Sequence, residues 1–451
     1  MIFDARKTAL ETLNTLDRGQ TTLDNLLEAV APEDTVISRR DRAFFQALVF
    51  GVLRWRGRLD FIINQYSKTR FEKIDSRVLN ILRLALFQII YLDRVPESAA
   101  VNTAVELAKA TVAPWVVGYV NAVLRKAAKN YQNLVFPAVD KDAISAIATA
   151  RSFPEWIIRR WMARYGLKNT AALCDDLNTI PTISIRTNRL KTSRHDLTQS
   201  LAGEVEQIMP TEYSPDGITF VHPATAIPGL SAFKAGWFQV QDEAAQLVSL
   251  LLNPQPGETV MDACAGFGGK TGHIAQLMQN RGAIVALDSH AGKLSRLKTE
   301  MQRLGVTIVD PLCGDLAKTD FQQQFESFDR ILLDAPCSGL GVMRRNPDIK
   351  WRISKKNLTI LVKKQQTFLE NLSRLVKPSG ILVYAVCSPE PEENEGVVNQ
   401  FLKKHPEFVI DKQVKAIPDQ MRSVEASNGW FKTFPRFSHM DGFSFVRLKR
   451  T

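Results

Sequence analysis

Two cysteines stand just after apolar segments, and a thiol in such a place is suited to covalent chemistry. Cys337 follows the apolar run 331–333 and Asp334, and Cys387 follows the apolar run 381–386. An apolar run that ends in polar residues with Gly or Pro is typical of a buried parallel strand reaching the carboxyl edge of a sheet. Ligands of open α/β sheets bind at that edge. Two thiols that meet there indicate nucleophilic catalysis by one or both of them.

A glycine-rich loop between a predicted strand and a predicted helix is the candidate cofactor site. Its residues are Cys264, Ala265, Gly266, Phe267, Gly268, Gly269 and Lys270. Glycines let the backbone turn sharply and approach a ligand closely. The spacing matches neither the phosphate-binding Walker loop nor the dinucleotide fingerprint. For this loop alone, a simple turn without a ligand stays an open alternative.

Two acidic residues extend the candidate cofactor site. Asp288 ends the apolar run 284–287, and Asp315 follows the third predicted strand. An acid at the end of the second strand can accept both ribose hydroxyls in Rossmann-like sites, and Asp315 could accept from an adenine amino group. Each acid alone is more typical of a strand-end cap or a turn. Together with the loop they favour an adenosine-containing ligand, either S-adenosylmethionine or a nicotinamide cofactor.

The composition favours a polyanionic partner. The 451 residues include 58 Lys and Arg against 47 Asp and Glu, a formal net charge of +11. An excess of this size is most often found in proteins that bind nucleic acid. No apolar run is long enough to cross a membrane and residues 1–17 lack a signal-peptide core, so we expect a cytoplasmic protein. The five cysteines form no Cys-x-x-Cys pair, so we expect neither a metal site nor a disulfide framework.

Three domains are predicted along the chain. Residues 1–135 show helical periodicity throughout, residues 145–235 mix helices with short strands such as 182–188 and 217–221, and residues 236–451 alternate helix and strand. Such alternation predicts a mainly parallel sheet. Its predicted strands are 259–262, 283–288, 306–309, 330–334, 381–386 and 442–448. The last follows a predicted helix at 395–404 as an added edge strand.

The helical block resembles the NusB family of all-helical RNA-binding domains. The matching stretches are 43–52, 82–88, 96–104 and 120–125. The resemblance covers roughly the first 130 residues and implies an RNA-binding role. A basic cluster accompanies it, either as a solvated helix face or as a surface that contacts phosphates. Its members are Arg39, Arg40, Arg42, Arg54, Arg56 and Arg58.

The two cysteine motifs in this order resemble the Sun/Fmu family of RNA cytosine-5 methyltransferases. The motifs are Asp334-Ala335-Pro336-Cys337 and Val386-Cys387-Ser388, and further matching stretches are 239–245, 344–351, 391–395 and 441–443. With the NusB-like block in front, the resemblance covers nearly the whole chain and is strongest to members that act on bacterial 16S ribosomal RNA. It implies a multidomain fold with an all-α NusB-like domain, a small α+β domain and a C-terminal α/β Rossmann-like methyltransferase domain. It further implies S-adenosylmethionine as cofactor and RNA as partner, and we expect a monomer.

The resemblance also implies roles for single residues. Carbon 5 of cytosine is a poor nucleophile, and a thiolate that adds to carbon 6 pushes electron density onto it. In the family the nucleophile corresponds to Cys387, Cys337 assists its release after methyl transfer, and Asp334 bonds the cytosine ring. The implied cofactor-binding residues are Cys264, Ala265, Gly266, Phe267, Gly268, Gly269, Lys270, Asp288, Asp315 and Asp334. Lys270 would contact the cofactor or Asp334.

Several points depart from the family pattern or stay open. The pair Gly266-Phe267 stands where the family has Ala-Pro, and Val386 stands where it has Thr. Methylation of another RNA, such as transfer RNA, and a non-catalytic role in ribosome assembly remain alternatives. A DNA substrate is disfavoured, because DNA cytosine-5 enzymes use the Pro-Cys thiol and need no second Cys.

A basic segment with an aromatic residue follows the Cys337 loop. It contains Arg344, Arg345, Lys350 and Trp351. We interpret it as a surface that binds phosphates and stacks a base. The alternative is a surface loop whose tryptophan lies in the core.

Overall fold

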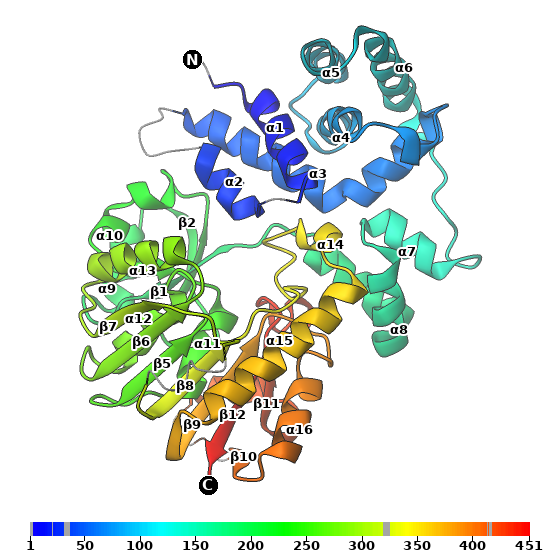
Figure 1. Cartoon of the computed structure of the whole chain (residues 1–451). Helices are drawn as coiled ribbons and strands as arrows, with labels where there is room; N and C mark the ends of the chain where they lie inside the picture. The colour runs from blue at the N-terminus through cyan, green and yellow to red at the C-terminus, as the bar shows by residue number, and fades with distance from the viewer. Residues whose placement is uncertain (1–2, 20, 31–36, 319–324, 413, 415–416) are drawn as a thin grey trace. The chain divides into compact units, whose positions relative to one another are not determined.

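The computed structural model describes residues 3–19, 21–30, 37–318, 325–412, 414 and 417–451 (Figure 1). The chain divides into two compact units. Unit 1 comprises Met1–Thr179 and Met343–Arg352, and unit 2 comprises Ile180–Val342 and Ile353–Thr451. The short segment Met343–Arg352 therefore belongs to unit 1, although its neighbours in the sequence belong to unit 2.

Unit 1 is built from helices in its described part, which confirms the all-α prediction for the N-terminal region. Polar side chains at the N-caps start several of them: Asp4 accepts from the Arg6 and Lys7 amides, and Asp75 accepts from the Arg77 amide. The helices are α1 (Ala5–Asp17), α2 (Leu23–Val30), α3 (Arg39–Tyr66), α4 (Ser76–Tyr91), α5 (Glu97–Thr111), α6 (Pro114–Asn130), α7 (Ala143–Arg151), α8 (Glu155–Leu177) and the short α14 (Ile349–Arg352). The apolar faces of α1 to α6 share one core.

The helix that follows Phe153 is broken in its middle, and its sequence explains why. Helix α8 is interrupted at Gly166, whose φ of 74° and ψ of 171° are not helical. Glycine adopts this left-handed region at little cost, so the chain can break the helix there. By its contacts α8 belongs to unit 1, together with α7.

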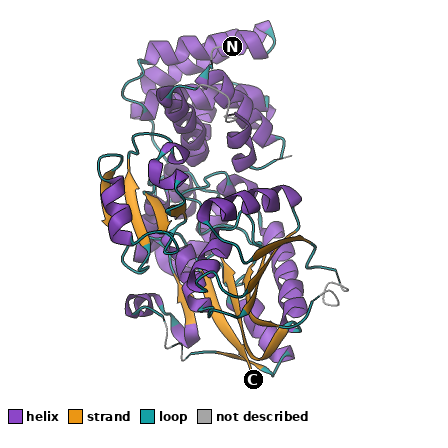
Figure 2. Cartoon of the chain, turned by 90° about the vertical axis from the view of Figure 1, so that its left-hand side faces the viewer, coloured by secondary structure: helices purple, strands orange, loops and turns teal. Residues whose placement is uncertain are grey.

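Unit 2 contains two sheets, drawn in orange in Figure 2. The smaller sheet has the order β2-β3-β1-β4 and is antiparallel throughout. Its strands are β1 (Ile183–Thr187), β2 (Glu206–Pro210), β3 (Gly217–Val221) and β4 (Phe238–Val240), with α9 (Arg194–Leu201) and α10 (Ser231–Lys234) beside them. A small core that includes Ile185, Ile218 and Phe220 joins these elements. The predicted small α+β domain is confirmed.

The larger sheet has the order β10-β12-β9-β8-β5-β6-β7, with β11 paired to β12. Neighbours from β9 to β7 are parallel, and β12 runs antiparallel to β9. The strands are β5 (Thr259–Ala263), β6 (Ala283–Asp288), β7 (Val309–Cys313), β8 (Phe328–Asp334), β9 (Val376–Val386), β10 (Phe408–Ile410), β11 (Trp430–Lys432) and β12 (Ser444–Arg450). The helices are α11 (Glu243–Leu252), α12 (Gly269–Leu277), α13 (Ala291–Leu304), α15 (Lys355–Ser373), α16 (Glu395–Lys404) and α17 (Pro435–Ser438). This arrangement confirms the predicted Rossmann-like C-terminal domain.

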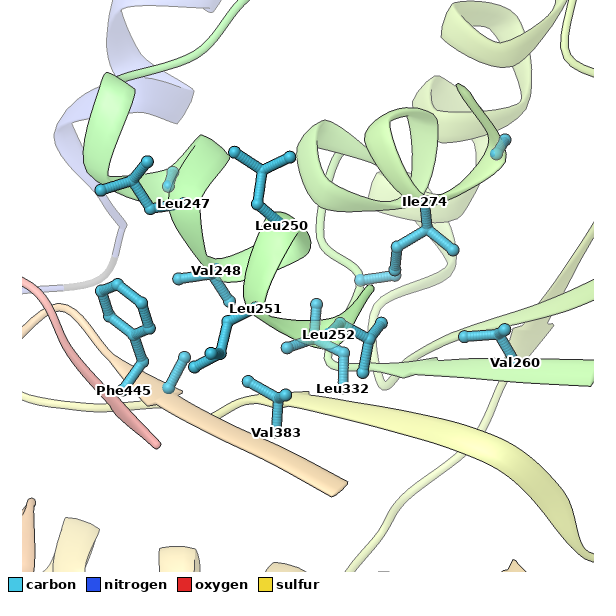
Figure 3. Packing of buried hydrophobic residues seen from close by; sticks show 14 of the residues in the cluster. Leu247, Val248, Leu250, Leu251, Leu252, Val260, Ile274, Leu332, Val383 and Phe445 are labelled. Carbon is cyan, nitrogen blue, oxygen red and sulfur yellow. The ribbon is translucent and has the colours of Figure 1, made fainter. Parts of the chain in front are cut away.

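Helices cover both faces of the larger sheet, so most residues of its central strands β5, β8 and β9 are buried. On one face α11 packs over the sheet, and Figure 3 shows Leu332 and Val383 with Leu251 of that helix. On the other face Leu333 and Leu382 share a core with α15 and α16. Alternate residues of a strand point to opposite faces, which explains why unbroken apolar runs were the correct strand signal here.

Two strand predictions were wrong in position. The third strand was expected at 306–309 but spans Val309–Cys313. It includes Pro311, which a strand accepts because β7 lies at the edge of the sheet. The last strand was expected at an edge. Instead β12 lies between β9 and β10, since the short strand β10, which had no recognisable pattern, pairs with its outer side.

Among the described residues, no helix is long and apolar enough to cross a membrane.

Candidate active site

The carboxyl ends of β8 and β9 bring the two cysteines together. The strands are adjacent and parallel, with Asp334 opposite Ala385, so the loops that follow them start side by side. The Sγ atoms of Cys337 and Cys387 lie 3.2 Å apart. The Gly341 amide donates to the Cys387 carbonyl at 3.0 Å, which ties the first loop to the second. Both thiols are half-buried, so each keeps some exposure to solvent.

A lysine and a carboxylate stand at the same edge. Lys270 Nζ lies 2.6 Å from Asp334 Oδ2 and 5.2 Å from the centre of the Phe443 ring. Burial lowers the pKa of Lys270, but the charge and hydrogen bond of Asp334 outweigh it, and the net pKa is raised. Negative charge on Cys387 adds to this effect. The ammonium group is therefore held in its charged form beside the two thiols.

The glycine-rich loop forms one wall of a cleft at this edge. The amides of Cys264 and Ala265 both donate to the Leu287 carbonyl, and the Gly266 amide donates to Asp288 Oδ2 at 3.0 Å. Cys264, Gly266 and Gly268 have φ of 74°, 57° and 85°, so the loop turns through left-handed backbone that the two glycines adopt without strain. The cleft is lined by Cys264, Gly266, Leu287, Asp288, Ser289, His290, Lys293, Gly314, Asp315, Leu316, Asp334, Pro336, Lys364 and Phe368.

The structure divides the predicted cofactor residues into two groups. Cys264, Gly266, Asp288, Asp315 and Asp334 line the cleft. The other predicted residues lie outside the lining of the cleft, and each has a different surrounding. Ala265 packs into the core, Gly268 and Gly269 begin α12, Lys270 pairs with Asp334, and Phe267 is 43% exposed beneath the guanidinium of Arg296.

Asp315 differs from Asp288 in what it binds. Its Oδ1 accepts from the Ala317 amide at 3.0 Å, which is the turn role that the sequence left open for each acid. Asp288 instead accepts from two amides, those of Gly266 and His290, and thereby fixes the loop and the turn after β6.

Sequence reasoning missed several lining residues, among them Ser289, His290 and Lys293 directly after β6. A signal was present, because residues that follow a strand-ending acid lie at the same sheet edge. Lys364 and Phe368 come from α15, and nothing local in the sequence marks them.

Two buried groups beneath the loop have raised pKa values. Burial raises the pKa of Asp262 to about 6, and Thr271 Oγ1 donates to its Oδ2 at 2.6 Å. Burial also raises the pKa of the Cys264 thiol, which is therefore neutral at ordinary pH and unsuited to act as a nucleophile.

The predicted phosphate-binding role of the 344–351 segment is wrong for Lys350. Lys350 is completely buried, and Nζ donates to the carbonyls of Arg54 and Ser152 and to Asn178 Oδ1. Trp351 Nε1 donates to the Leu53 carbonyl at 2.6 Å. Lys350 is a structural element of unit 1, since a buried polar group needs such partners, and the half-buried Trp351 is anchored to α3 by its hydrogen bond. Gly57 permits this packing, because a Cβ there would lie 2.9 Å from the Trp351 ring.

The basic cluster of unit 1 is also divided by the structure. Arg54 is buried and donates to the Arg344 carbonyl, Arg56 pairs with Asp17, and Arg58 lies 5.0 Å from the Phe136 ring centre. Arg39 and Arg40 are exposed at the start of α3. Only part of the cluster is therefore open to a phosphate.

The lining of the cleft fits an adenosine-containing cofactor. Gly266 has no heavy atom within 4 Å of the place where a Cβ would lie, so the loop leaves open space at its bend. The carboxylates of Asp288, Asp315 and Asp334 line this cleft. A parallel sheet with this loop after its first strand and an acid after its second is an arrangement in which Rossmann-like proteins bind an adenosine-containing cofactor.

Comparison with known proteins identifies the family. Residues 249–449 match the family described as 16S rRNA methyltransferase RsmB/F, residues 4–129 match the NusB family, and residues 153–226 match the RsmF/B-like ferredoxin-like domain. The chain belongs to the RsmB/F family of ribosomal RNA methyltransferases, which use S-adenosylmethionine and act on RNA.

Its relatives extend over the full length. The chain is 37% identical to the probable ribosomal RNA small subunit methyltransferase B of Synechocystis sp., over all of both chains. It is 33% identical to the probable ribosomal RNA small subunit methyltransferase B of Bacillus subtilis, over 99% of this chain and 98% of the relative. Among solved structures, that of PH0851 covers 100% of both chains with a TM-score of 0.83 and 27% identity.

Proposed function

We propose that the protein transfers a methyl group to carbon 5 of a cytosine in 16S ribosomal RNA, through a covalent bond between Cys387 and the cytosine ring. The observation that carries this proposal is the pair of thiols 3.2 Å apart at the ends of β8 and β9, beside the Lys270–Asp334 ion pair. A methyltransferase whose substrate accepts the methyl group on a nitrogen or an oxygen needs no such pair of thiols. S-adenosylmethionine, when bound, supplies the methyl group.

Cys387 is the nucleophile in this proposal. Its sulfur adds to carbon 6 of the cytosine, and the electron pair of the C5–C6 double bond becomes available at carbon 5, which takes the methyl group. The Lys270 ammonium stabilises negative charge on this sulfur before the attack. Asp334 Oδ2 is used by Lys270, so we assign Oδ1 to the cytosine ring, where it favours protonation of nitrogen 3.

Cys337 acts at release. The carbon 5 proton must leave before the Cys387 sulfur can depart and the double bond can reform. The hydrogen bond with Cys387 is the main cause that raises the pKa of Cys337, followed by burial and by the charge on Cys387. Once Cys387 is bonded to carbon, its hydrogen bond and charge are lost. Cys337 then deprotonates more readily and can accept the proton from carbon 5.

The cleft residues would hold the cofactor. We assign the ribose hydroxyls to Asp288 and the base side to the turn that contains Asp315. Phe267 stands outside the cleft, so the Gly266-Phe267 departure leaves the lining intact. Val386 is completely buried in the core between the sheet and α15, so the family's Thr hydroxyl would not face the cleft here.

Substitution of each thiol tests the covalent step. Cys387→Ala should abolish methyl transfer to ribosomal RNA while S-adenosylmethionine still binds. Cys337→Ala should accumulate an RNA–protein adduct that survives denaturing gels. Cys313→Ser is the control, since Cys313 is exposed and does not line the cleft. Turnover by Cys387→Ala, or no adduct with Cys337→Ala, would refute the assigned roles.

A separate experiment must identify the nucleotide that receives the methyl group. Bisulfite sequencing of total RNA from a strain that lacks the gene should show one cytosine of 16S ribosomal RNA losing its methylation. Loss in transfer RNA would redirect the proposal to that substrate. No loss in any RNA would favour an assembly factor. We further propose that the enzyme acts as a monomer in the cytoplasm, with functional domains at 1–135, 145–235 and 236–451.

A further inference from the structure

A buried glutamate connects the loops that carry the two thiols. Glu393 lies just before α16 and has no solvent exposure. It follows the Cys387 loop in the sequence, and it contacts the residue after each cysteine. Those residues are Ser338 and Ser388, which are also buried.

Four donors satisfy the Glu393 carboxylate. Oε1 accepts from the Ser338 amide at 2.8 Å and from Gln365 Nε2 at 3.1 Å. Oε2 accepts from the hydroxyls of Ser338 and Ser388, each at 2.5 Å. Short hydrogen bonds to an ionised acceptor are stronger than neutral ones and define geometry more sharply.

The surrounding contacts fix Glu393 itself. The Tyr384 hydroxyl donates to the Glu393 carbonyl at 2.6 Å. Gln365 Nε2, which binds Oε1, also donates to the Pro336 carbonyl at 3.0 Å, directly before Cys337. A strand of the sheet and a helix on its face therefore hold the glutamate in place. Any shift of the carboxylate would move both thiol loops together.

We propose that Glu393 is a positioning residue that sets the relative placement of the Cys387 and Cys337 sulfurs. It does not line the cofactor cleft, so it acts through Ser338 and Ser388 rather than on a reactant. Attack and release use different sulfurs on the same ring, so both steps depend on the distance between them. This inference rests on the covalent mechanism proposed above and names a residue that this mechanism lacked.

The Glu393→Gln variant provides an isosteric test. An amide has one acceptor oxygen, whereas four donors require two, so two of the donors lose their acceptor. We expect both adduct formation and product release to slow by about 100-fold, the effect of a misplacement on the order of 1 Å. The dissociation constant of S-adenosylmethionine should stay within about twofold, because the cleft is unchanged. Glu392→Gln, at the exposed neighbouring residue, is the matched control.

A double-mutant cycle separates positioning from stability. Ser338→Ala and Ser388→Ala should each slow adduct formation, with effects that are not additive because both hydroxyls bind Oε2. In the Glu393→Gln background that non-additivity should disappear. A purely structural role would lower the melting temperature and leave the rates per folded molecule unchanged. The serine variants keep the test usable if Glu393→Gln folds poorly.

Adduct formation is measured in the Cys337→Ala parent, by gel shift after denaturation, and release is measured with Cys337 present. If the parent forms no adduct, the covalent mechanism itself fails. If the parent forms adduct and Glu393→Gln matches it within threefold in both steps, with additive serine effects, the positioning role of Glu393 is refuted.

Discussion

Two buried lysines, one in each unit, differ in their binding partners and in the direction in which their pKa is shifted. Lys270 of unit 2 has 11% of its side chain exposed and lies 2.6 Å from a carboxylate oxygen. Lys350 of unit 1 is completely buried, and its partners are two backbone carbonyls and an amide oxygen, with the Phe153 ring centre 3.7 Å away. Both segments looked equally functional in the sequence.

The difference lies in what compensates the loss of water. A carboxylate outweighs desolvation at Lys270 and raises its pKa. At Lys350 burial dominates, and its pKa is lowered well below 10.5. A buried lysine with an anion is held charged for electrostatic work, whereas one with only dipoles holds segments together. The comparison predicts that substitutions will affect activity in one case and stability in the other.

The largest effect is expected from Lys270→Met. Asp334 would lose its cation and the thiols would lose the nearby positive charge, so methyl transfer should fall about 10²–10³-fold, as for other preorganised electrostatic groups. Single-turnover assays with labelled cofactor measure this rate. Lys298→Met on the exposed face of α13 is the control. A Lys270→Met enzyme with near-normal turnover would remove the contrast between the two lysines.

Lys350→Ala should affect stability instead. The substitution leaves a cavity and removes donors from three oxygens, so the free energy of unfolding should fall by about 2–4 kcal/mol. The methylation rate per folded molecule should stay unchanged. Calorimetry of the full-length protein measures the loss, with Lys356→Met as an exposed control. Unchanged stability would show that the buried ammonium contributes nothing to unit 1.

The pH dependence sharpens the comparison. The pKa of Lys350 is lower in the folded than in the unfolded state, so between its folded pKa and 10.5 the unfolded chain binds more protons, and stability rises with pH. The pKa of Lys270 is raised, so its contribution is present below 10.5 and is lost as pH rises through the folded value. Between the folded pKa of Lys350 and 10.5, the free energy of unfolding of the wild type should rise relative to that of Lys350→Met by up to about 1.4 kcal/mol per pH unit. Unfolding by urea at several pH values measures this. If the free energy of unfolding of the wild type fell with pH relative to that of Lys350→Met, the predicted direction would be wrong.

The smallest effect is expected from Trp351→Phe. The ring is kept in part, and only the hydrogen bond from Nε1 to the Leu53 carbonyl is lost. The free energy of unfolding should fall by about 1 kcal/mol. RNA affinity should not change, whereas a base-stacking tryptophan would lose affinity. A filter-binding titration at fixed salt distinguishes these outcomes.

The sequence predicted the fold because its signals were local. Unbroken apolar runs marked β5, β6, β8 and β9, and the polar residues after them marked the sheet edge with Cys337 and Cys387. The strand β7 was misplaced because Pro311 is acceptable only at an edge, and edge position is a tertiary property.

The roles of buried polar residues could not be predicted in the same way. Lys350 looked like an exposed cation, because its partners Arg54, Ser152 and Asn178 are distant in the sequence. Glu393 lies in the 391–395 stretch that matches the family, but nothing in the sequence distinguished it from the other acids there. Cleft residues such as Lys364 were missed for the same reason, since only the packing of α15 brings them to the sheet edge.

The membership of Met343–Arg352 in unit 1 has a consequence for synthesis on the ribosome. Residues 1–179 emerge first, but Lys350 and Trp351, which join helix α3 to the chain beyond α7, are made only after residues 180–342. At ordinary rates of protein synthesis that interval is on the order of 10 s or more. During this time the nascent helical unit is incomplete, and its maturation must wait for the first half of the catalytic sheet to be translated.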